Sequence, residues 1–296
     1  MNNSLFSKFS YHLQRRVHNV RARNFMAFCY RIILPKIKLN KGINFLHINK
    51  LDKNIIKDLN NDGFSDLGIT LSETQIKKIK TYLKPLKCYE NIYDSKTKIN
   101  LENPNKNVQL GHYKREDLID IPELVGIAND SKILNIVSSY LGVKPTISNI
   151  NCWWSFGNRE VAKEAQFFHR DLDDVKFVKV FFYLTDVNSQ SGPHMFIKRS
   201  HKSNKLNQLK RFSDQEVFLK YDKKDILTLE SSKGSCFIED TYGIHKGQLP
   251  LTNNRLILQV QYSYLPLHGE KYIPKRSDVI NNLSIDKYTN RLLFKY

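Results

Sequence analysis

The sequence has only four cysteines in 296 residues, and their spacing fits none of the usual cysteine-based sites. Cys29, Cys88, Cys152 and Cys236 lie far apart, without a C-x-x-C pair, which excludes a disulfide scaffold and a zinc finger. No run of about 18 apolar residues occurs, so no membrane-spanning helix is expected. The N-terminus also lacks the apolar segment of a secretory signal. We therefore expect a cytoplasmic protein with reduced thiols.

Acidic residues are missing from the first 51 positions, which contain ten lysines and arginines. The whole chain has 47 basic and 29 acidic residues, a formal net charge of +18. This excess favours an anionic partner or substrate, although chains rich in Lys, Asn and Ile also acquire it without functional meaning. No helix-turn-helix, zinc-finger or basic-aromatic pattern accompanies the charge, so we expect no nucleic-acid partner.

Residues 4–34 are predicted to be helical, because apolar residues recur there at three- and four-residue steps between arginines, at Leu5, Phe9, Leu13, Val17 and Val20. Three interpretations stay open. The apolar stripe packs on the body of the protein, it contacts a membrane surface or another subunit, or the acid-free segment is an organellar targeting signal. We expect residues 1–50 to form a basic helical extension and residues 51–296 a single domain.

The rest of the chain changes from helical to strand-like patterns. Ser72 and Gln75 form a capping box, Pro122 suits a first helical turn, and Gly142 suits a helix end. Residues 88–116 are polar and are predicted to form a long surface loop. Four segments rich in aromatic and β-branched residues follow, at 146–156, 177–187, 236–244 and 255–265. This order predicts a mainly β protein with flanking helices (α+β), built as an antiparallel sandwich or barrel.

His169 and Asp171 are the first candidates for metal binding, because residues i and i+2 of an extended segment point to the same side. His245 follows a later predicted strand, and Arg255 opens the next one. Two imidazoles and a carboxylate leave three positions open on an octahedral ion, and ferrous iron uses this arrangement to bind a 2-oxo acid and dioxygen. An arginine fork can pair with the far carboxylate of such an acid.

With its neighbouring segments, this set resembles the phytanoyl-CoA dioxygenase family of Fe(II)- and 2-oxoglutarate-dependent oxygenases. The resemblance runs from about residue 51 to residue 266. It rests on the H-x-D, on residues 179–187, on Ser191-Gly192-Pro193 through Ser200-His201-Lys202, on residues 234–238, and on His245 and Arg255. It implies a double-stranded β-helix, a jelly roll of the cupin type, in which oxidative decarboxylation of 2-oxoglutarate by O2 is coupled to hydroxylation of a small organic substrate.

The resemblance also implies roles for individual residues. His169, Asp171 and His245 match the iron ligands, and Arg255 matches the 2-oxoglutarate anchor. Halogenating relatives lack the carboxylate that Asp171 provides, so hydroxylation is expected. The family's usual Pro-Gly is replaced by Lys198-Arg199, and Ile257 provides no hydroxyl two residues after Arg255.

Other candidates and alternatives remain beside this interpretation. Trp153 and Gln166 are further candidates for binding the co-substrate. Neighbouring residues of a strand point to opposite faces, so at most one of Trp153 and Trp154 is expected to line the site, and either could instead pack in the core. Lys179 could belong to the pocket rim or be a solvated charge. His169 and Asp171 could be a chance surface pair, and Arg255 could form an ion pair with Glu239 or Asp240. The alternative function is a catalytically silent jelly roll that serves as a binding or scaffold protein.

Overall fold

The computed structural model describes residues 4–37, 43–281 and 283–296, with side chains from Lys8 onward. Two helices, α1 (Ser4–Arg16) and α2 (Val20–Ile33), replace the single helix predicted for residues 4–34. The chain breaks between them because the Asn19 side chain accepts hydrogen bonds from the backbone N–H groups of Arg21 and Ala22, which starts a new helix. Of the predicted apolar stripe, Val20 is buried, Phe9 and Leu13 are exposed, and the Leu5 side chain lies outside the described part.

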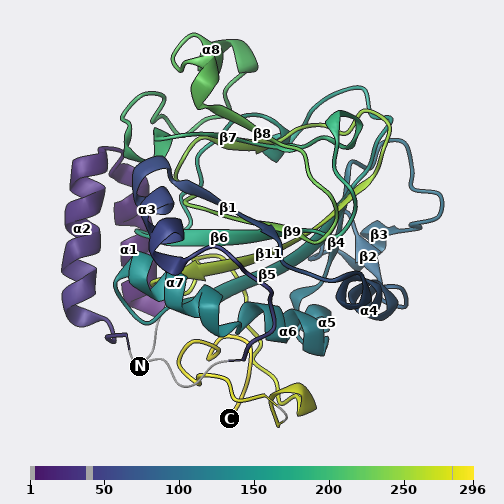
Figure 1. The fold of residues 1–296 in the computed structure, drawn as a ribbon, viewed down its shortest axis with the longest axis horizontal. Helices are drawn as coiled ribbons and strands as arrows, with labels where there is room; N and C mark the ends of the chain where they lie inside the picture. The colour runs from purple at the N-terminus through teal and green to yellow at the C-terminus, as the bar shows by residue number, and fades with distance from the viewer. Residues whose placement is uncertain (1–3, 38–42, 282) are drawn as a thin grey trace.

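The body of the protein is a pair of antiparallel sheets. The larger sheet contains, in spatial order, β1 (Phe64–Ile69), β9 (Ser235–Glu239), β6 (Phe177–Tyr183), β11 (Arg255–Ser263), β5 (Thr146–Ser155), β4 (Leu110–Tyr113), β2 (Cys88–Tyr89) and β3 (Lys98–Ile99). The smaller sheet contains β10 (His245–Gly247), β7 (His194–Ile197) and β8 (Ile226–Leu229). In Figure 1, β7 and β8 lie above the larger sheet. This arrangement confirms the predicted mainly β jelly roll with flanking helices.

Helices cover the outside of the larger sheet. They are α3 (Asp52–Asp62), α4 (Glu73–Leu83), α5 (Arg115–Leu118), α6 (Pro122–Ala128) and α7 (Ser131–Leu141), while α8 (Asp214–Phe218) lies at the top of Figure 1 beyond the smaller sheet. The capping box of Ser72 and Gln75 starts α4, and Gly142 ends α7 in a left-handed conformation, as predicted. Gly63 ends α3 at φ 79°, where a Cβ would lie only 2.4 Å from Nδ1 of His201.

Strand alternation separates an apolar outer side from a more polar inner side. On β6, Val178, Val180 and Phe182 belong to the large core beneath the helices, whereas Lys179 and Phe181 face the space between the sheets. Strands β5 and β11 alternate in the same way. Polar side chains of these strands are therefore buried between the two sheets, and this position determines where the site lies.

Besides dividing the N-terminal helix, the structure corrects one further prediction and adds elements that the sequence pattern did not indicate. Residues 88–116 are not a long loop, because β2, β3 and β4 join the larger sheet there, β4 pairing with β5. The strands of the smaller sheet were also not predicted, since three or four residues are too short to show an alternating pattern. None of the helices described here combines the length and the apolar character that crossing a bilayer requires.

Candidate metal and co-substrate site

The segment before β6 and the start of β10 bring His169, Asp171 and His245 together. His169 and His245 form an antiparallel bridge in which each backbone N–H donates to the other's carbonyl oxygen at 3.0 Å. The three potential ligand atoms all lie within 4.8 Å of one another. Nε2 of His169 is 3.5 Å from Oδ1 of Asp171, and Nε2 of His245 is 3.4 Å from Oδ2. The two imidazoles and the carboxylate can thus share one metal ion.

Backbone carbonyls fix the two imidazoles in the tautomer that a metal needs. Nδ1 of His169 lies 2.9 Å from the carbonyl oxygen of Phe167, and Nδ1 of His245 lies 3.0 Å from that of Gly243. A carbonyl oxygen only accepts, so each Nδ1 carries a proton, and in the neutral form of each imidazole the lone pair is on Nε2, facing Asp171. This is the outer support that metal-binding histidines usually have, and the residues therefore fit a divalent ion.

Burial and the neighbouring charges shift the pKa values of the three side chains. Burial would raise the pKa of Asp171, but Lys179 and then His245 hold this pKa well below its usual range. Burial lowers the pKa of His169, with a further contribution from His245, whereas Asp171 raises the pKa of His245 against the effect of burial. At neutral pH, Asp171 is an ionised carboxylate and the His169 imidazole is neutral, which are their ligating forms.

Lys179 is the closest cation to the triad. Its Nζ lies 2.7 Å from Oδ2 of Asp171 and 3.0 Å from Oδ2 of Asp173. The Asp173 carboxylate also accepts a hydrogen bond of 3.1 Å from Nε2 of Gln261. This chain of contacts holds the Asp171 carboxylate in one orientation. The sequence raised Lys179 only as an uncertain pocket residue, because its contact with Asp171 depends on the path of the chain before β6.

Arg255 is buried in the same region and has no counter-charge. Its Nη1 donates to the carbonyl oxygen of Gly192, and its Nη2 donates to Oγ of Ser155 at 3.3 Å, but its Nε has no partner. No ion pair joins it to a carboxylate in the described chain, and burial lowers its pKa. The alternative pairings do not occur, since Glu239 lies 2.9 Å from His194 and Asp240 pairs with Lys176.

A cavity of about 180 Å³ joins these groups. Its lining includes the triad, Lys179, Arg255, Trp153, Gln166 and Ser155. Gln166 accepts a hydrogen bond from the backbone N–H of Lys163 through Oε1, while its buried Nε2 has no partner. Trp154 points to the other face of β5, where its Nε1 donates to the Tyr113 hydroxyl at 3.2 Å. Of the two tryptophans, only Trp153 lines the cavity.

Residues 59–254 match the family model described as phytanoyl-CoA dioxygenase (PhyH), which spans this cavity up to the residue before Arg255. The chain belongs to the phytanoyl-CoA dioxygenase family. No curated protein matches it.

Solved structures share the fold of this family member at low sequence identity. An EctD from S. alaskensis, solved with 2-oxoglutarate and 5-hydroxyectoine, is 15% identical at a TM-score of 0.54, with 77% of this chain and 82% of that chain covered. SnoK, a non-haem α-ketoglutarate-dependent carbocyclase from nogalamycin biosynthesis, is 14% identical at a TM-score of 0.53, with 72% and 84% covered. The epimerase SnoN of the same biosynthesis is 14% identical at a TM-score of 0.52, with 76% and 93% covered.

The structure describes the surroundings of the two departures from the usual pattern of the phytanoyl-CoA dioxygenase family, Lys198-Arg199 and Ile257. Arg199 takes the left-handed conformation, at φ 62°, that a glycine adopts without strain. Ile257 provides no hydroxyl, whereas Ser155, which pairs with Arg255 across β5 and β11, contacts the guanidinium through its Oγ. Sequence reasoning missed Ser155 because only the register between two distant strands places it beside Arg255.

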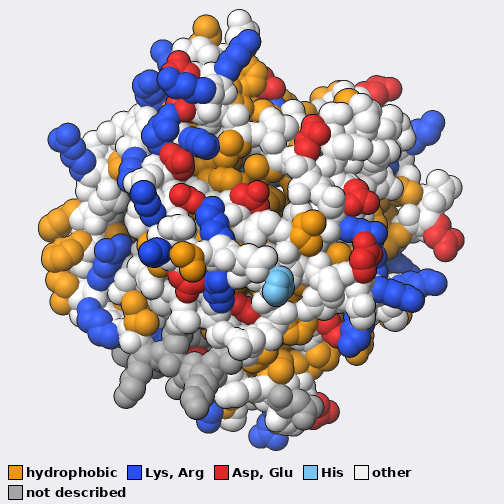
Figure 2. Space-filling view, viewed as in Figure 1, with side chains coloured by type: hydrophobic (Ala, Val, Ile, Leu, Met, Phe, Trp, Pro, Cys, Tyr) orange, Lys and Arg blue, Asp and Glu red, His pale blue; other side chains and the backbone are white. Residues whose placement is uncertain are grey.

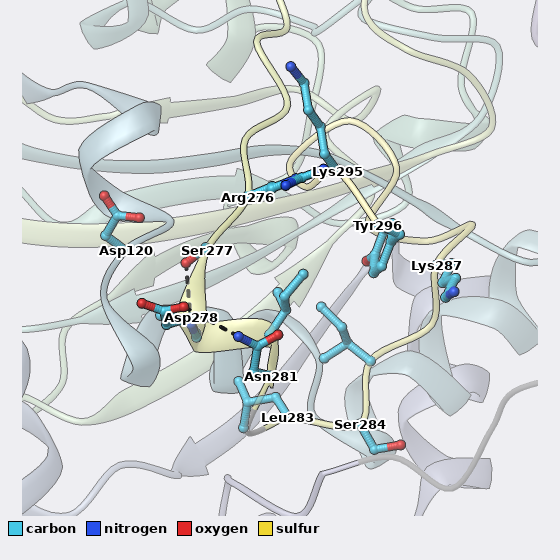
Figure 3. A pocket seen from close by; sticks show the side chains of 13 residues that line it. Asp120, Arg276, Ser277, Asp278, Asn281, Leu283, Ser284, Lys287, Lys295 and Tyr296 are labelled. Carbon is cyan, nitrogen blue, oxygen red and sulfur yellow. Dashed lines mark hydrogen bonds between the residues drawn. The ribbon is translucent and has the colours of Figure 1, made fainter.

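Two of the cavities that are larger than the triad cavity have a bearing on function. A cleft of about 570 Å³ adjoins the site, because its residue His112 stacks on Trp153 with ring centroids 6.2 Å apart. Another cavity, about 890 Å³, is lined by the C-terminal segment and Asp120 (Figure 3). The hydrogen bonds drawn there are local, for example from Nδ2 of Asn281 to Asp278. We find no cluster of metal-ligating groups in it among the residues with assigned positions.

Proposed function

We propose that the protein is a non-haem Fe(II)- and 2-oxoglutarate-dependent dioxygenase that hydroxylates a small organic substrate. The observation that carries this proposal is that one small cavity contains both a metal-ready triad and a buried arginine without a counter-charge. A divalent cation fits the first, and a carboxylate fits the second. A co-substrate that binds a metal at one end and carries a carboxylate at the other satisfies both.

His169, Asp171 and His245 would hold the iron. The two imidazoles present their Nε2 lone pairs, because their Nδ1 protons are engaged by carbonyl oxygens. Lys179 neutralises part of the charge on Asp171 and keeps its carboxylate from turning away. Bound iron, with 2-oxoglutarate and O2, supplies the oxidising chemistry that can hydroxylate an unactivated C–H bond, and the protein supplies orientation and a dry cavity.

Arg255 would pair with the far carboxylate of 2-oxoglutarate. Its Nε and the remaining protons of Nη1 and Nη2 are available as donors, beside the hydroxyl of Ser155. Burial excludes water from this pair, which strengthens the charge-assisted hydrogen bonds. Gly247 leaves room for the guanidinium, since a Cβ there would lie 3.0 Å from Nη2. The unpaired Nε2 of Gln166 is a further donor for the co-substrate or the substrate.

The substrate would bind across the adjoining cleft, because drug-sized ligands usually occupy about 300–1,000 Å³ and the triad cavity is smaller. Three basic and three acidic side chains line this cleft: Lys114, Arg115, Lys271, Glu90, Glu116 and Glu270. Asn149 and Asn151 add amide groups. This balance favours a polar substrate, and it gives no support to the anionic preference suggested by the net charge of the whole chain.

Two further parts of the proposal concern the setting of the enzyme. Three of the four free cysteines are buried, and we expect the protein to work in the cytoplasm, where thiols stay reduced. We also expect residues 4–34 to contact a membrane surface or another subunit, separately from the catalytic cavity.

The first test of the proposed function is anaerobic addition of Fe(II) and 2-oxoglutarate. We expect the charge-transfer absorption of the iron-bound 2-oxo acid in the wild type, its loss in His169→Ala, and its retention in His47→Ala, which removes an exposed histidine. Absorption that survives in His169→Ala would refute the assigned site. Absorption without succinate release across a substrate panel in air would favour the silent binding protein.

The second test identifies the reaction. With isotopically labelled O2 and an accepted substrate, we expect one labelled oxygen in succinate and one in the product. SnoK and SnoN are described as a carbocyclase and an epimerase. Succinate formation with an unlabelled, cyclised or epimerised product would therefore keep the cofactor assignment and replace hydroxylation.

A further inference from the structure

The two N-terminal helices turn polar side chains inward. Gln14 of α1 is fully buried, and its Nε2 donates to the carbonyl oxygen of Leu172 at 2.6 Å. Arg23 of α2 is also buried and donates at 2.9 Å to the carbonyl oxygens of Gln14 and Asp174. Ala27 and Tyr30 complete the inner side of α2. The contact of these helices with the body thus combines buried hydrogen bonds with apolar packing of Val20, Ala27 and Tyr30.

The opposite side of α2 is apolar and exposed. Phe25, Phe28, Ile32 and Ile33 are 67%, 58%, 63% and 65% exposed, and Cys29 between them is exposed as well. These five residues, which we call the outer face, lie on one side of the helix. Four-residue steps join Phe25, Cys29 and Ile33, and a four-residue step also joins Phe28 and Ile32. Figure 2 shows apolar atoms gathered at the left edge of the molecule, where Figure 1 places α2. A contiguous apolar patch of this kind marks an interaction surface.

The charged side chains of the segment that contains α1 and α2 are all basic. Lys8, Arg16, Arg21 and Lys36 are exposed, and no ion pair involves residues 4–37, the first described stretch. The segment before Asp52 has no carboxylate at all. An isologous contact with a second copy would bring two such basic segments together, which like-charge repulsion disfavours. An anionic surface would instead gain from both the apolar side chains and the lysines and arginines.

We propose that the outer face docks α2, lying in the plane of the surface, onto a membrane that contains anionic phospholipids. Phe25, Phe28, Ile32 and Ile33 enter the boundary between headgroups and acyl chains, and the flanking cations contact the phosphates. The body of the protein stays in water, held to α1 and α2 by Arg23 and Gln14. This proposal is independent of the proposed catalytic function.

Cosedimentation of the full chain with vesicles tests the proposal. We expect binding to equimolar phosphatidylglycerol and phosphatidylcholine, binding at least about tenfold weaker to phosphatidylcholine alone, and weakening with added salt. Phe25→Ser/Ile32→Ser should lower the affinity for the anionic vesicles at least about tenfold, because two inserted side chains are lost. Leu209→Ser/Leu219→Ser, which changes two exposed apolar residues in another basic region, should bind like the wild type.

Cys29 provides a second readout on the outer face itself. It is exposed and the other cysteines, Cys88, Cys152 and Cys236, are buried, so an environment-sensitive thiol dye should label it selectively in the folded protein. We expect a blue shift of the dye on addition of anionic vesicles. The proposal is overturned if the wild type ignores these vesicles, if the double variant binds them equally well, or if sedimentation equilibrium shows a dimer that Phe25→Ser/Ile32→Ser dissociates. An unchanged far-UV circular dichroism spectrum is required of both variants.

Discussion

Arg23 and Arg255 are both only 4% exposed, yet they have opposite surroundings. Arg23, beneath the N-terminal helices, donates to backbone carbonyls of Gln14, Asp174 and Val175, and its guanidinium lies 4.3 Å from the ring centroid of Tyr242. Arg255, between the sheets, leaves Nε without a partner. Burial lowers the pKa of both side chains.

The comparison separates a cation whose hydrogen bonds are complete within the fold from one that we propose to be functional. A buried donor without a partner costs free energy, which a protein tolerates where a ligand later supplies the acceptor. Arg23 has its acceptors within the chain and stabilises the fold. Arg255 is short of an acceptor, and we infer that its contribution appears when the co-substrate binds.

Replacing Arg255 gives the largest expected effect. Arg255→Met should raise the dissociation constant of 2-oxoglutarate about a thousandfold, because two charge-assisted hydrogen bonds of about 2 kcal/mol each are lost. The free energy of unfolding should fall by only about 1–2 kcal/mol, since the hydrogen bonds to Gly192 and Ser155 are lost but no internal ion pair is broken. Calorimetric titration of the metal-loaded protein and urea unfolding measure the two quantities. A large loss of stability with unchanged affinity would reverse the roles of the two arginines.

Replacing Arg23 should produce the opposite pattern. Arg23→Met leaves several buried carbonyl oxygens without donors and should lower the free energy of unfolding by about 3 kcal/mol. Binding of 2-oxoglutarate should stay within about twofold of the wild type. Urea unfolding and the same titration provide the measurements, and limited trypsin cleavage between α1 and α2 would report local detachment. Equal effects of both replacements on affinity would contradict the comparison.

The sequence predicted those parts of the molecule that depend on local signals. The start of α4 at Ser72 and the end of α7 at Gly142 follow from side-chain caps and a left-handed residue. The longer strands β5, β6, β9 and β11 follow from their aromatic and β-branched content. The strands of the smaller sheet were missed because their pairing, rather than their composition, defines them. The orientation of α2, with Arg23 buried and Phe25 exposed, was not predicted, because nothing in the sequence indicates that Arg23 faces the body of the protein.

The residues of the site were likewise predicted only where a sequence pattern identifies them. His169, Asp171, His245 and Arg255 were identified by their order and spacing within a family pattern, and they line one cavity. Ser155 and the contact of Lys179 with Asp171 were not identified, because each depends on where strands far apart in the chain are placed. Long-range register is the information that a single sequence does not display.

Asp174, whose backbone carbonyl accepts a hydrogen bond from Arg23, should make the stability of this region depend on pH. Its carboxylate accepts hydrogen bonds from the backbone N–H groups of Val175 and Leu265, and burial raises its pKa to about 7. The raised pKa means that the folded state binds the proton more tightly than the unfolded state. Stability from this group is therefore complete below the ordinary pKa of 3.8 and falls as the pH rises through about 7.

We expect the Asp174 contribution to decline by on the order of 1 kcal/mol per pH unit between pH 5 and 7. Asp174→Asn has no ionisable group and should lack this slope, whatever its absolute stability. Urea unfolding of both proteins across this range gives the difference, which removes the contribution of the histidines. Parallel pH profiles would show that Asp174 titrates normally and that Arg23 compensates its burial.

The smallest expected effect concerns the hydroxyl beside Arg255. Ser155→Ala removes a hydrogen bond of about 1 kcal/mol to Nη2 and should raise the KM for 2-oxoglutarate about three- to tenfold, with kcat nearly unchanged. Ser155→Thr keeps the hydroxyl and should recover part of the loss. Steady-state kinetics with varied 2-oxoglutarate provide the measurement. A fall in kcat alone would place Ser155 outside the co-substrate contact.

The reciprocal backbone bridge between His169 and His245 has a consequence for metal loading. Main-chain hydrogen bonds align the two imidazoles, so the apoprotein already has the cradle and can exchange its ion after folding. Because the protein provides only three ligands, it imposes little geometric selection, and Ni²⁺ or Cu²⁺ should outcompete Fe²⁺ at equal concentration according to the usual order of divalent affinities. The identity of the bound ion is therefore set by the free-metal levels of the cell in which the chain matures.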